Sequence, residues 1–290
     1  MSVQEIALAF PRGTHQEVFL EGVLRYAADH DCNWSYITTP ESLSLSVLDL
    51  AGWPGDGILA SINTPEEADF AATLSIPVVN VSSAMAESPV PRSIVDNNAI
   101  GVLAAEHLLS KAFPHYAFYG LSGVEYSRRR QQGFTEKLAE AGRASENMYL
   151  SMPTFGLRGN SWLNQHRALA EWLASLATPC GLFAVSDYRA RQALDACRSI
   201  NLKVPEQIAV IGVDNETDYL RTRLPSTFER RAKRSDGRLP RRRVAPPPAA
   251  RGSGRRRDPD YRTAPSRRAR IYGDVRGGGS ASVQGNDLSS

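Results

Sequence analysis

Short apolar runs alternate with helix-period segments along the first 215 residues. The runs are rich in β-branched and aromatic residues, are apolar on both faces, and end at Gly, Asp, Asn or Ser, as strands covered on both sides do. They predict strands at residues 5–10, 34–38, 56–60, 77–82, 93–96, 116–121, 181–186 and 208–213. Helices with one apolar face are predicted by four sets at i, i+3, i+4 and i+7 or i+8 spacing. The sets are Leu20, Val23, Leu24 and Ala27; Ile100, Leu103, Ala104 and Leu108; Phe134, Leu138 and Ala141; and Ala190, Ala193, Leu194 and Cys197.

A strand followed by a helix, several times over, predicts an α/β fold of parallel sheets with helices on both faces. Ligands of such sheets bind outside the carboxyl ends of the strands. The residues that directly follow each strand are therefore where a functional site is expected.

Polar residues follow three of these strands. They are Asp96 and Asn97 in "SIVDNNAIG", Asp187 and Arg189 in "FAVSDYRAR", and Asp214 and Asn215 in "VIGVDNE". Because Asp and Asn also cap helices, capping remains an alternative for Asp96, Asn97 and Asp187. No convincing helix follows Asp214, so its carboxylate at the end of a buried strand favours a ligand contact.

Three consecutive arginines, in "YSRRRQQGF", open a predicted helix, where positive charge opposes the helix dipole. Only one of three successive residues can face a given side of a helix, so one arginine is expected to reach the cleft while the others are solvated. Carboxylates that accept from vicinal hydroxyls, together with an arginine that donates to sugar oxygens, suit a small polyhydroxylated ligand. The expected ligand is a small sugar.

Motifs of catalysis, phosphate binding and metal binding are missing from the sequence. There is no GxxxxGK[ST], no GxGxxG after the first strand, no HExxH and no GxSxG, so we predict no catalytic residue, no cofactor and no metal. The three cysteines, Cys32, Cys180 and Cys197, share no metal-ligand spacing and fit buried thiols in a reducing cytoplasm. No apolar run is long enough to span a bilayer, and the first residues lack a basic leader region, so we expect a cytoplasmic location without membrane contact.

Several motifs together resemble a known family. "DNNAIG", "RRRQQGF", "FAVSDYRAR" and "VPEQIAVIGVDNE" resemble the effector domains of lactose/galactose-repressor-type regulators. "YAFYGL", "GDGILA" and "AVSDYRARQALDAC" are most similar to the sensors of xylose-operon regulators, and the resemblance covers roughly residues 5–224. It implies two lobes of the periplasmic-binding-protein type I fold, each with a doubly wound parallel sheet, that close around xylose or a related monosaccharide.

The resemblance also implies roles for individual residues. Asp187 and Asp214 match the family's hydroxyl-binding acids, Arg130 matches its sugar-binding arginine, and Asp96 matches an Asp-Asn pair that follows a lobe-one strand. The loop "PRGTHQE", which includes Arg12, lies where the family lines its cleft. Asn215 and Arg189 complete the predicted ligand set.

The stretch from residue 225 onwards differs from the rest of the chain. Before it there are 17 basic and 25 acidic residues, and from it on there are 17 basic and 6 acidic ones. Rich in Arg, Pro, Gly, Ala and Ser and without apolar period, it is expected to be disordered. We interpret it as the product of a frameshift near residues 225–231, which leaves the fold incomplete at its C-terminal end. The predicted domains are lobe one at 1–112, lobe two at 113–224 and this basic tail at 225–290.

In the xylose-operon regulators an arabinose-regulator-type helix-turn-helix domain follows the sensor, so the resemblance implies operator DNA as a partner and a homodimer in the intact protein. That domain is expected to be missing from this chain, which puts its own DNA binding in doubt. Two alternatives stay open: a stand-alone solute-binding protein, and sequence-independent binding of nucleic acid through the arginine-rich tail.

Overall fold

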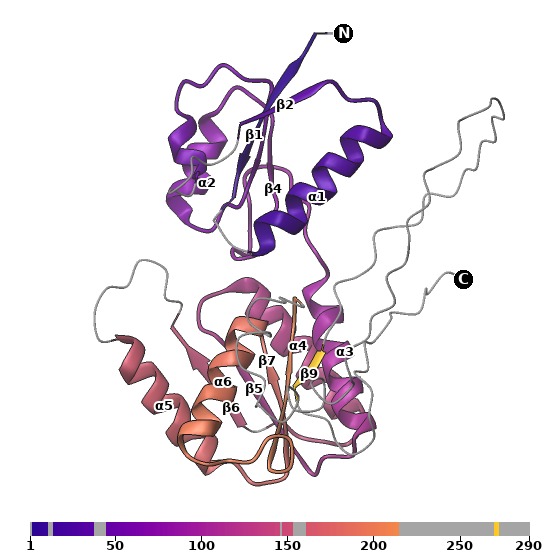
Figure 1. Cartoon of the computed structure of the whole chain (residues 1–290), viewed down its shortest axis with the longest axis vertical. Coiled ribbons are helices and arrows are strands. Elements are labelled where there is room, and N and C mark those ends of the chain that lie inside the picture. The colour runs from indigo at the N-terminus through magenta and orange to yellow at the C-terminus, as the bar shows by residue number, and fades with distance from the viewer. Residues whose placement is uncertain are drawn as a thin grey trace, which may run out of the picture.

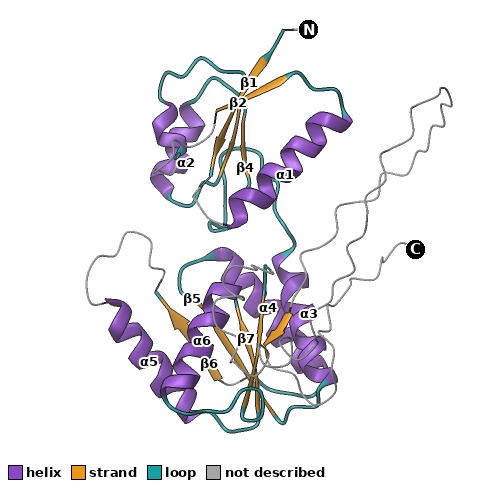
Figure 2. Cartoon of the chain, in the orientation of Figure 1, coloured by secondary structure: helices purple, strands orange, loops and turns teal. Residues whose placement is uncertain are grey.

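Two β-sheets form two separate lobes (Figure 1). The computed structural model describes residues 2–10, 14–37, 45–145, 147–152, 161–214 and 270–272. In each lobe the sheet lies between helices (Figure 2). The predicted α/β architecture with two parallel sheets is confirmed.

The first lobe holds a four-stranded parallel sheet in the order β2-β1-β3-β4. Its strands are β1 (Gln4–Ala9), β2 (Trp34–Ile37), β3 (Gly57–Ala60) and β4 (Val78–Asn80), and its helices are α1 (Thr14–Asp29), the 3-10 helix η1 (Val47–Leu50) and α2 (Pro65–Thr73). Ala7 and Ala9 pack with η1 and α2 on one side of this sheet. A capping box of Thr64 and Glu67 starts α2, so the strand-to-helix turn is set by local sequence.

The second lobe holds a five-stranded sheet in the order β6-β5-β7-β8-β9, in which only β9 runs antiparallel. Its strands are β5 (His115–Leu121), β6 (Asn147–Ser151), β7 (Cys180–Ala184), β8 (Ile208–Gly212) and β9 (Arg270–Tyr272), and its helices are α3 (Asn97–Ser110), α4 (Glu125–Glu140), α5 (Ser161–Ser175) and α6 (Asp187–Ser199). Phe118 and Phe183 pack under α3 and α4, whereas Ala117 and Leu182 pack under α5 and α6. This alternation explains why the strand sequences are apolar on both faces.

Helices α3 and α4 touch backbone to backbone. A β-carbon on Gly101 would lie 2.0 Å from the backbone oxygen of Arg130, and one on Gly133 would lie 2.1 Å from that of Asn98. The close crossing holds α3 on the second lobe. The chain therefore leaves the first lobe before Asn97, whereas the sequence placed the domain boundary at residue 112.

Three expectations about elements differ from the structure. The strand predicted at 93–96 is wrong: this stretch is irregular and leads from one lobe to the other, with Ile94 and Val95 exposed. Strand β6, the 3-10 helix η1 and helices α2 and α5 have no counterpart among the predicted elements. The tail from residue 225 was expected to be disordered, but residues 270–272 form strand β9. The other tail residues lie outside the described part of the chain.

Candidate functional site

Two carboxylates sit where the neighbouring strands β7 and β8 end. Asp187 opens α6, and its backbone N–H donates to the Val213 oxygen at 2.8 Å, which joins the ends of the two strands. The cap of α6 is Ser186, whose hydroxyl accepts from the Arg189 N–H at 3.3 Å. Asp187 therefore does not cap α6, and only 1 % of this residue is exposed. Its negative charge in the first turn is stabilised by the helix dipole.

Asp214 lies just beyond β8, half-buried, with φ at 102°. Few non-glycine residues adopt such a φ, and those that do cluster at functional sites. Burial raises the pKa of Tyr126, the Asp214 charge raises it too, and the positive charges of Arg130 and Arg189 oppose the rise. Asp214, Arg130 and Arg189 are thus all close enough to the Tyr126 hydroxyl for their charges to change its pKa.

Arg130 is the one arginine of its triplet that is buried, with only 5 % of the residue exposed. Its Nε donates to Asn97 Oδ1 at 2.9 Å, its Nη1 donates to the Val185 backbone oxygen, and its guanidinium lies 5.2 Å from the centre of the Tyr126 ring. Hydrogen bonds and a cation–π contact thus fix the orientation of a buried positive charge just after β7, two residues before Asp187.

Arg128 and Arg129 point elsewhere, as helical spacing predicts. Both pair with Glu125 in the first turn of α4, at 2.6 and 2.8 Å, and both side chains are more than half exposed. Hydrogen bonds from these arginines lower the pKa of Glu125 to about 2. The acid offsets the unfavourable placement of the arginines at a helix N-terminus.

Asp96 caps α3: its Oδ1 accepts from the Ala99 N–H at 2.9 Å, and the residue is exposed. Asn97, the next residue, is buried, and it reaches both Arg130 and the Ser83 hydroxyl. The sequence marked Asn97 only as one residue of an Asp-Asn pair. Nothing in its spacing indicates a contact with Arg130, which lies 33 residues further along the chain.

Arg189 is directed toward the sheet rather than along the strand ends. It is buried, and its Nη1 donates to Gln192 Oε1 at 2.6 Å and to the Tyr119 hydroxyl at 3.3 Å. The remaining members of the predicted set, Arg12 and Asn215, lie outside the described residues.

A polar cluster that the sequence analysis did not single out lies at the matching edge of the first lobe. Asn80 ends β4, is fully buried, and accepts through Oδ1 from the backbone N–H groups of Ile62 and Ser82, at 3.1 and 2.8 Å. The Ser82 hydroxyl donates to Asn63 Oδ1 at 2.7 Å. The sequence signal for this cluster is one asparagine, Asn80, inside an apolar run, and a polar residue at such a position is equally typical of an ordinary strand end.

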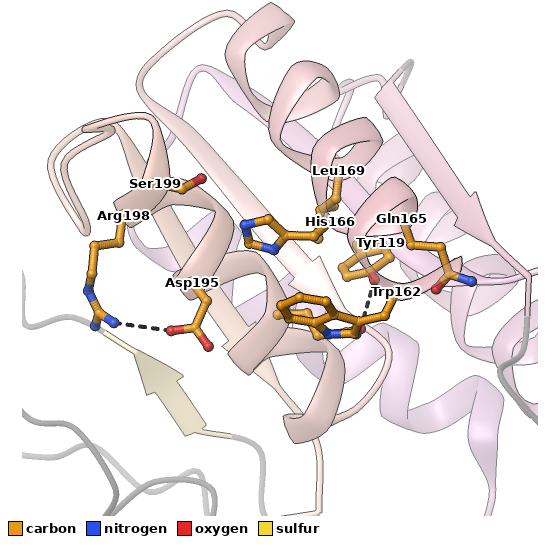
Figure 3. Close-up of a pocket in the computed structure, with 9 residues that line it drawn as sticks. Tyr119, Trp162, Gln165, His166, Leu169, Asp195, Arg198 and Ser199 are labelled. Atoms are coloured by element: carbon orange, nitrogen blue, oxygen red, sulfur yellow. Dashed lines mark hydrogen bonds and ion pairs between the residues drawn. The ribbon is translucent and has the colours of Figure 1, made fainter. Parts of the chain in front are cut away.

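A cavity of about 510 Å³ lies between α5 and α6 on the outer side of the second sheet (Figure 3). Trp162 and His166 stack at one side of it, and the ion pair of Asp195 with Arg198 lies at the other. The carboxylate here is already neutralised, and the indole is largely exposed. We therefore place the candidate ligand site at the ends of β7 and β8, where buried charges converge.

Groups for other chemistries are not gathered in the described part of the chain. No three His, Cys, Asp or Glu side chains there could hold a metal ion, and none of its helices is long and apolar enough to cross a membrane. Burial raises the pKa of Cys180 to about 12 and that of Cys197 to about 11, so both thiols are unreactive near neutrality.

Comparison with known proteins defines the class. Residues 105–253, just over half of the chain, match the model of the periplasmic binding protein-like domain, and the chain belongs to this family. It is similar to the xylose operon regulatory protein of Escherichia coli K12, at 32 % identity over 212 residues that make up 69 % of this chain and 52 % of that protein. The xylose operon regulatory protein of Haemophilus influenzae is 29 % identical over 224 residues, 73 % of this chain and 56 % of the relative.

A solved structure of a xylose-binding transcription activator shares the fold, with a TM-score of 0.63 at 28 % identity, over 74 % of this chain and 55 % of that one. The resemblance predicted from the sequence motifs is thus confirmed. The chain spans about half the length of the curated relatives it matches. These relatives are named as regulators rather than enzymes, in agreement with the prediction that the chain does not catalyse a reaction.

Proposed function

We propose that this chain is the sugar-sensing domain of a transcription regulator, and that its effector is xylose or a closely related monosaccharide. One observation carries the proposal: the buried Arg130 donates to the Val185 oxygen just after β7, where Asp187 opens α6, and it lies over Tyr126, whose pKa the Asp214 charge raises. The similarity to xylose operon regulatory proteins supports the same ligand class.

The chemistry of these groups fits a sugar. Two carboxylates accept hydrogen bonds from hydroxyls, the guanidinium donates to sugar oxygens, and charge-assisted bonds of this kind contribute roughly 1.5 to 3 kcal/mol each. The Tyr126 ring, already under the guanidinium, adds an apolar face beside these groups. Arg12 and Asn215 stay predictions of further contacts, as does Asp96, whose carboxylate also caps α3.

Regulation would follow from closure of the lobes. A ligand that contacts both lobes binds the closed arrangement more tightly and shifts the population toward it. On the first-lobe side, Asn63 and Ser82 place polar, hydrogen-bonded groups just after β3 and β4. In the whole regulator we propose a homodimer in the cytoplasm whose operator-DNA affinity changes with sugar; the relatives' names support the regulatory part of this proposal.

Isothermal titration calorimetry of the full chain against D-xylose, D-ribose, L-arabinose and D-glucose tests the sugar site. We expect one pentose to bind in the micromolar range and Asp187→Asn to weaken it by about 30-fold, since an amide replaces a charged acceptor. The matched control is Asp195→Asn on the outer side of the same helix, where the carboxylate is paired with Arg191 and Arg198. Equal losses in both variants would contradict the assignment.

Nucleic-acid binding needs a separate experiment. A gel-shift titration of the full chain with operator-like and scrambled duplexes, at two salt concentrations and with and without D-xylose, distinguishes the possibilities. Binding that ignores sequence and sugar and falls steeply with salt would come from the arginine-rich tail. Sugar-dependent, sequence-selective binding would mean that this chain reads DNA itself.

A further inference from the structure

Three hydrogen bonds join the segment after β4 to the second lobe. The backbone N–H groups of Glu125 and Tyr126 donate to the carbonyl oxygens of Ala84 and Ser83, at 2.8 and 2.9 Å, and Asn97 Nδ2 donates to the Ser83 hydroxyl at 2.9 Å. Residues 82–84, which we call the pivot segment, thus satisfy amides in the first turn of α4 that would otherwise lack partners.

The pivot segment is fixed to the first lobe at its other end. The Ser82 N–H donates to the fully buried Asn80 at the end of β4, and the Ser82 hydroxyl both donates to Asn63 and accepts from the Ala84 N–H. A displacement of the first lobe is therefore transmitted to Ser83.

The side-chain amide of Asn97 connects the pivot segment to the candidate sugar site. It donates to the Ser83 hydroxyl and accepts from Arg130 Nε at 2.9 Å, and its second, longer donation of 3.3 Å goes to the Val95 oxygen. An asparagine amide can turn over and exchange its oxygen and nitrogen. Here the Arg130 Nε donor and the Val95 carbonyl acceptor fix one orientation of the amide, and in that orientation its Nδ2 group also reaches the Ser83 hydroxyl, which adds to the same arrangement.

Arg130 has little freedom to adapt if that orientation is lost. Its other nitrogen is bound to the Val185 oxygen at the end of β7, and its guanidinium rests over the Tyr126 ring. A reversed amide would present an N–H group to the arginine's own N–H donor inside a buried site. Arg130 would then turn away from its place just after β7, at the candidate sugar site.

We propose that Asn97 is a positioning residue that couples the first lobe to the sugar-binding arginine. The inference rests on the proposed function, because it assumes that Arg130 contacts the sugar. The coupling runs from the Ser83 hydroxyl through the Asn97 amide to the Arg130 guanidinium, so that sugar affinity depends on a residue of the pivot segment that need not touch the sugar. By linkage, sugar binding favours the lobe arrangement in which this hydrogen bond is made.

Two substitutions at Asn97 separate positioning from packing. Asn97→Asp keeps the acceptor for Arg130, and the Ser83 hydroxyl can rotate to donate to the new carboxylate. Asn97→Leu keeps a similar volume but removes both hydrogen bonds. We expect D-xylose affinity within about threefold of the unmodified chain for Asn97→Asp and about 30-fold weaker for Asn97→Leu. A residue that only fills space would tolerate leucine as well as aspartate.

A double-mutant cycle on the full chain tests the coupling itself. We expect Ser83→Ala alone to weaken D-xylose binding about fivefold, and to have no further effect in the Asn97→Leu background, where the coupling is already broken. Ser110→Ala is the matched control, since that hydroxyl only donates to the His107 oxygen of its own helix. Thermal unfolding of every variant identifies those that fail to fold. If Asn97→Leu fails, the cycle is repeated with Asn97→Asp. In that background Ser83→Ala should weaken D-xylose binding, because it removes the hydroxyl that donates to the new carboxylate.

The outcomes distinguish a failure of the proposed sugar site from a failure of the proposed coupling through Asn97. If the unmodified chain binds none of the four sugars, the proposed function and the coupling both fall. If it binds a sugar but the effects of Ser83→Ala and Asn97→Leu add in full, the sugar site stands and the coupling is wrong.

Discussion

Gly101 on α3 lies against the backbone oxygen of Arg130 on α4, with room for a hydrogen atom and nothing larger. The crossing of these helices brings Asn97, one turn before Gly101, within reach of the Arg130 side chain. A packing detail in the helix layer therefore sets the position of the charged group at the candidate site. The same contact provides the first prediction.

Gly101→Ala should destabilise the protein although alanine is the better helix former. The new methyl group would lie 2.0 Å from a backbone oxygen, so the helices must separate, which costs about 2–3 kcal/mol and exceeds the gain of about 1 kcal/mol in helix propensity. Gly22→Ala in α1, where nothing lies within 4 Å, is the control and should stabilise by up to about 1 kcal/mol. Urea unfolding measures both; a stabilising Gly101→Ala would contradict the close crossing.

Asp214 combines a strained backbone with a candidate role in binding. Glycine adopts a φ of 102° with less strain than aspartate does. Asp214→Gly should therefore raise the free energy of unfolding by about 0.5–1 kcal/mol while weakening sugar binding. Asp214→Asn keeps the backbone constraint and removes the charge, so it should lose affinity without gaining stability. Calorimetric titration and thermal unfolding of the two variants decide the matter, because a variant that gains stability and keeps full affinity would remove Asp214 from the site.

Glu125 should make stability depend on pH in the acid range. Its pKa falls to about 2 in the folded chain from an ordinary value near 4.5, because Arg128 and Arg129 donate to its carboxylate. The stabilisation is present above about pH 4.5 and is lost as the pH falls toward 2. Glu125→Gln should therefore destabilise by about 1 kcal/mol at pH 7, a modest value since the arginines are exposed, and should flatten the stability curve between pH 4.5 and 2.

Urea unfolding at pH 7, 4 and 3 tests this dependence, with Glu136→Gln on the exposed side of the same helix as the control. High salt should reduce the effect at Glu125, because the pairs are close to solvent. A curve of Glu125→Gln that runs parallel to that of the unmodified chain at all three pH values would show that the carboxylate is not selectively stabilised.

How far the sequence predicts this fold depends on how strongly each segment is buried. Strands such as β7 and β8 are buried along their whole length, and their apolar runs identify them from the sequence alone. Strand β6 is at a sheet edge, where Met148 and Leu150 are exposed, so its pattern is not distinctive. The run at 93–96 resembles a strand in composition, but it crosses between lobes, and its contact with β4 is a single backbone hydrogen bond from Ser93 to the Asn80 oxygen, next to the isolated bridge of Arg92 with Asn80.

The candidate site was predictable where a residue follows a buried strand. Asp187 and Asp214 occupy such positions, and helical spacing allowed only one member of the arginine triplet to face the strand ends. Long-range partners were not predictable. Neither the contact of Asn97 with Arg130 nor the direction of Arg189 toward Tyr119 follows from local pattern, because both depend on how elements far apart in the chain pack together.

Deleting residues 232–290 should leave sugar affinity within about twofold. The site residues Arg130 and Asp187 belong to elements between residues 97 and 213, and the described part of the tail adds only β9, which pairs with Val210–Gly212 at the sheet edge. Calorimetric titration of a chain ending at residue 231 measures the effect. Ile271→Pro in the full chain is the companion variant, because proline disfavours a paired strand and so tests β9 without removing the rest of the tail. A tenfold loss of affinity in both variants would mean that β9 supports Asp214 through the end of β8. A loss in the shortened chain alone would assign the effect to other tail residues. Unchanged affinity in both variants would locate the whole sugar site before residue 232.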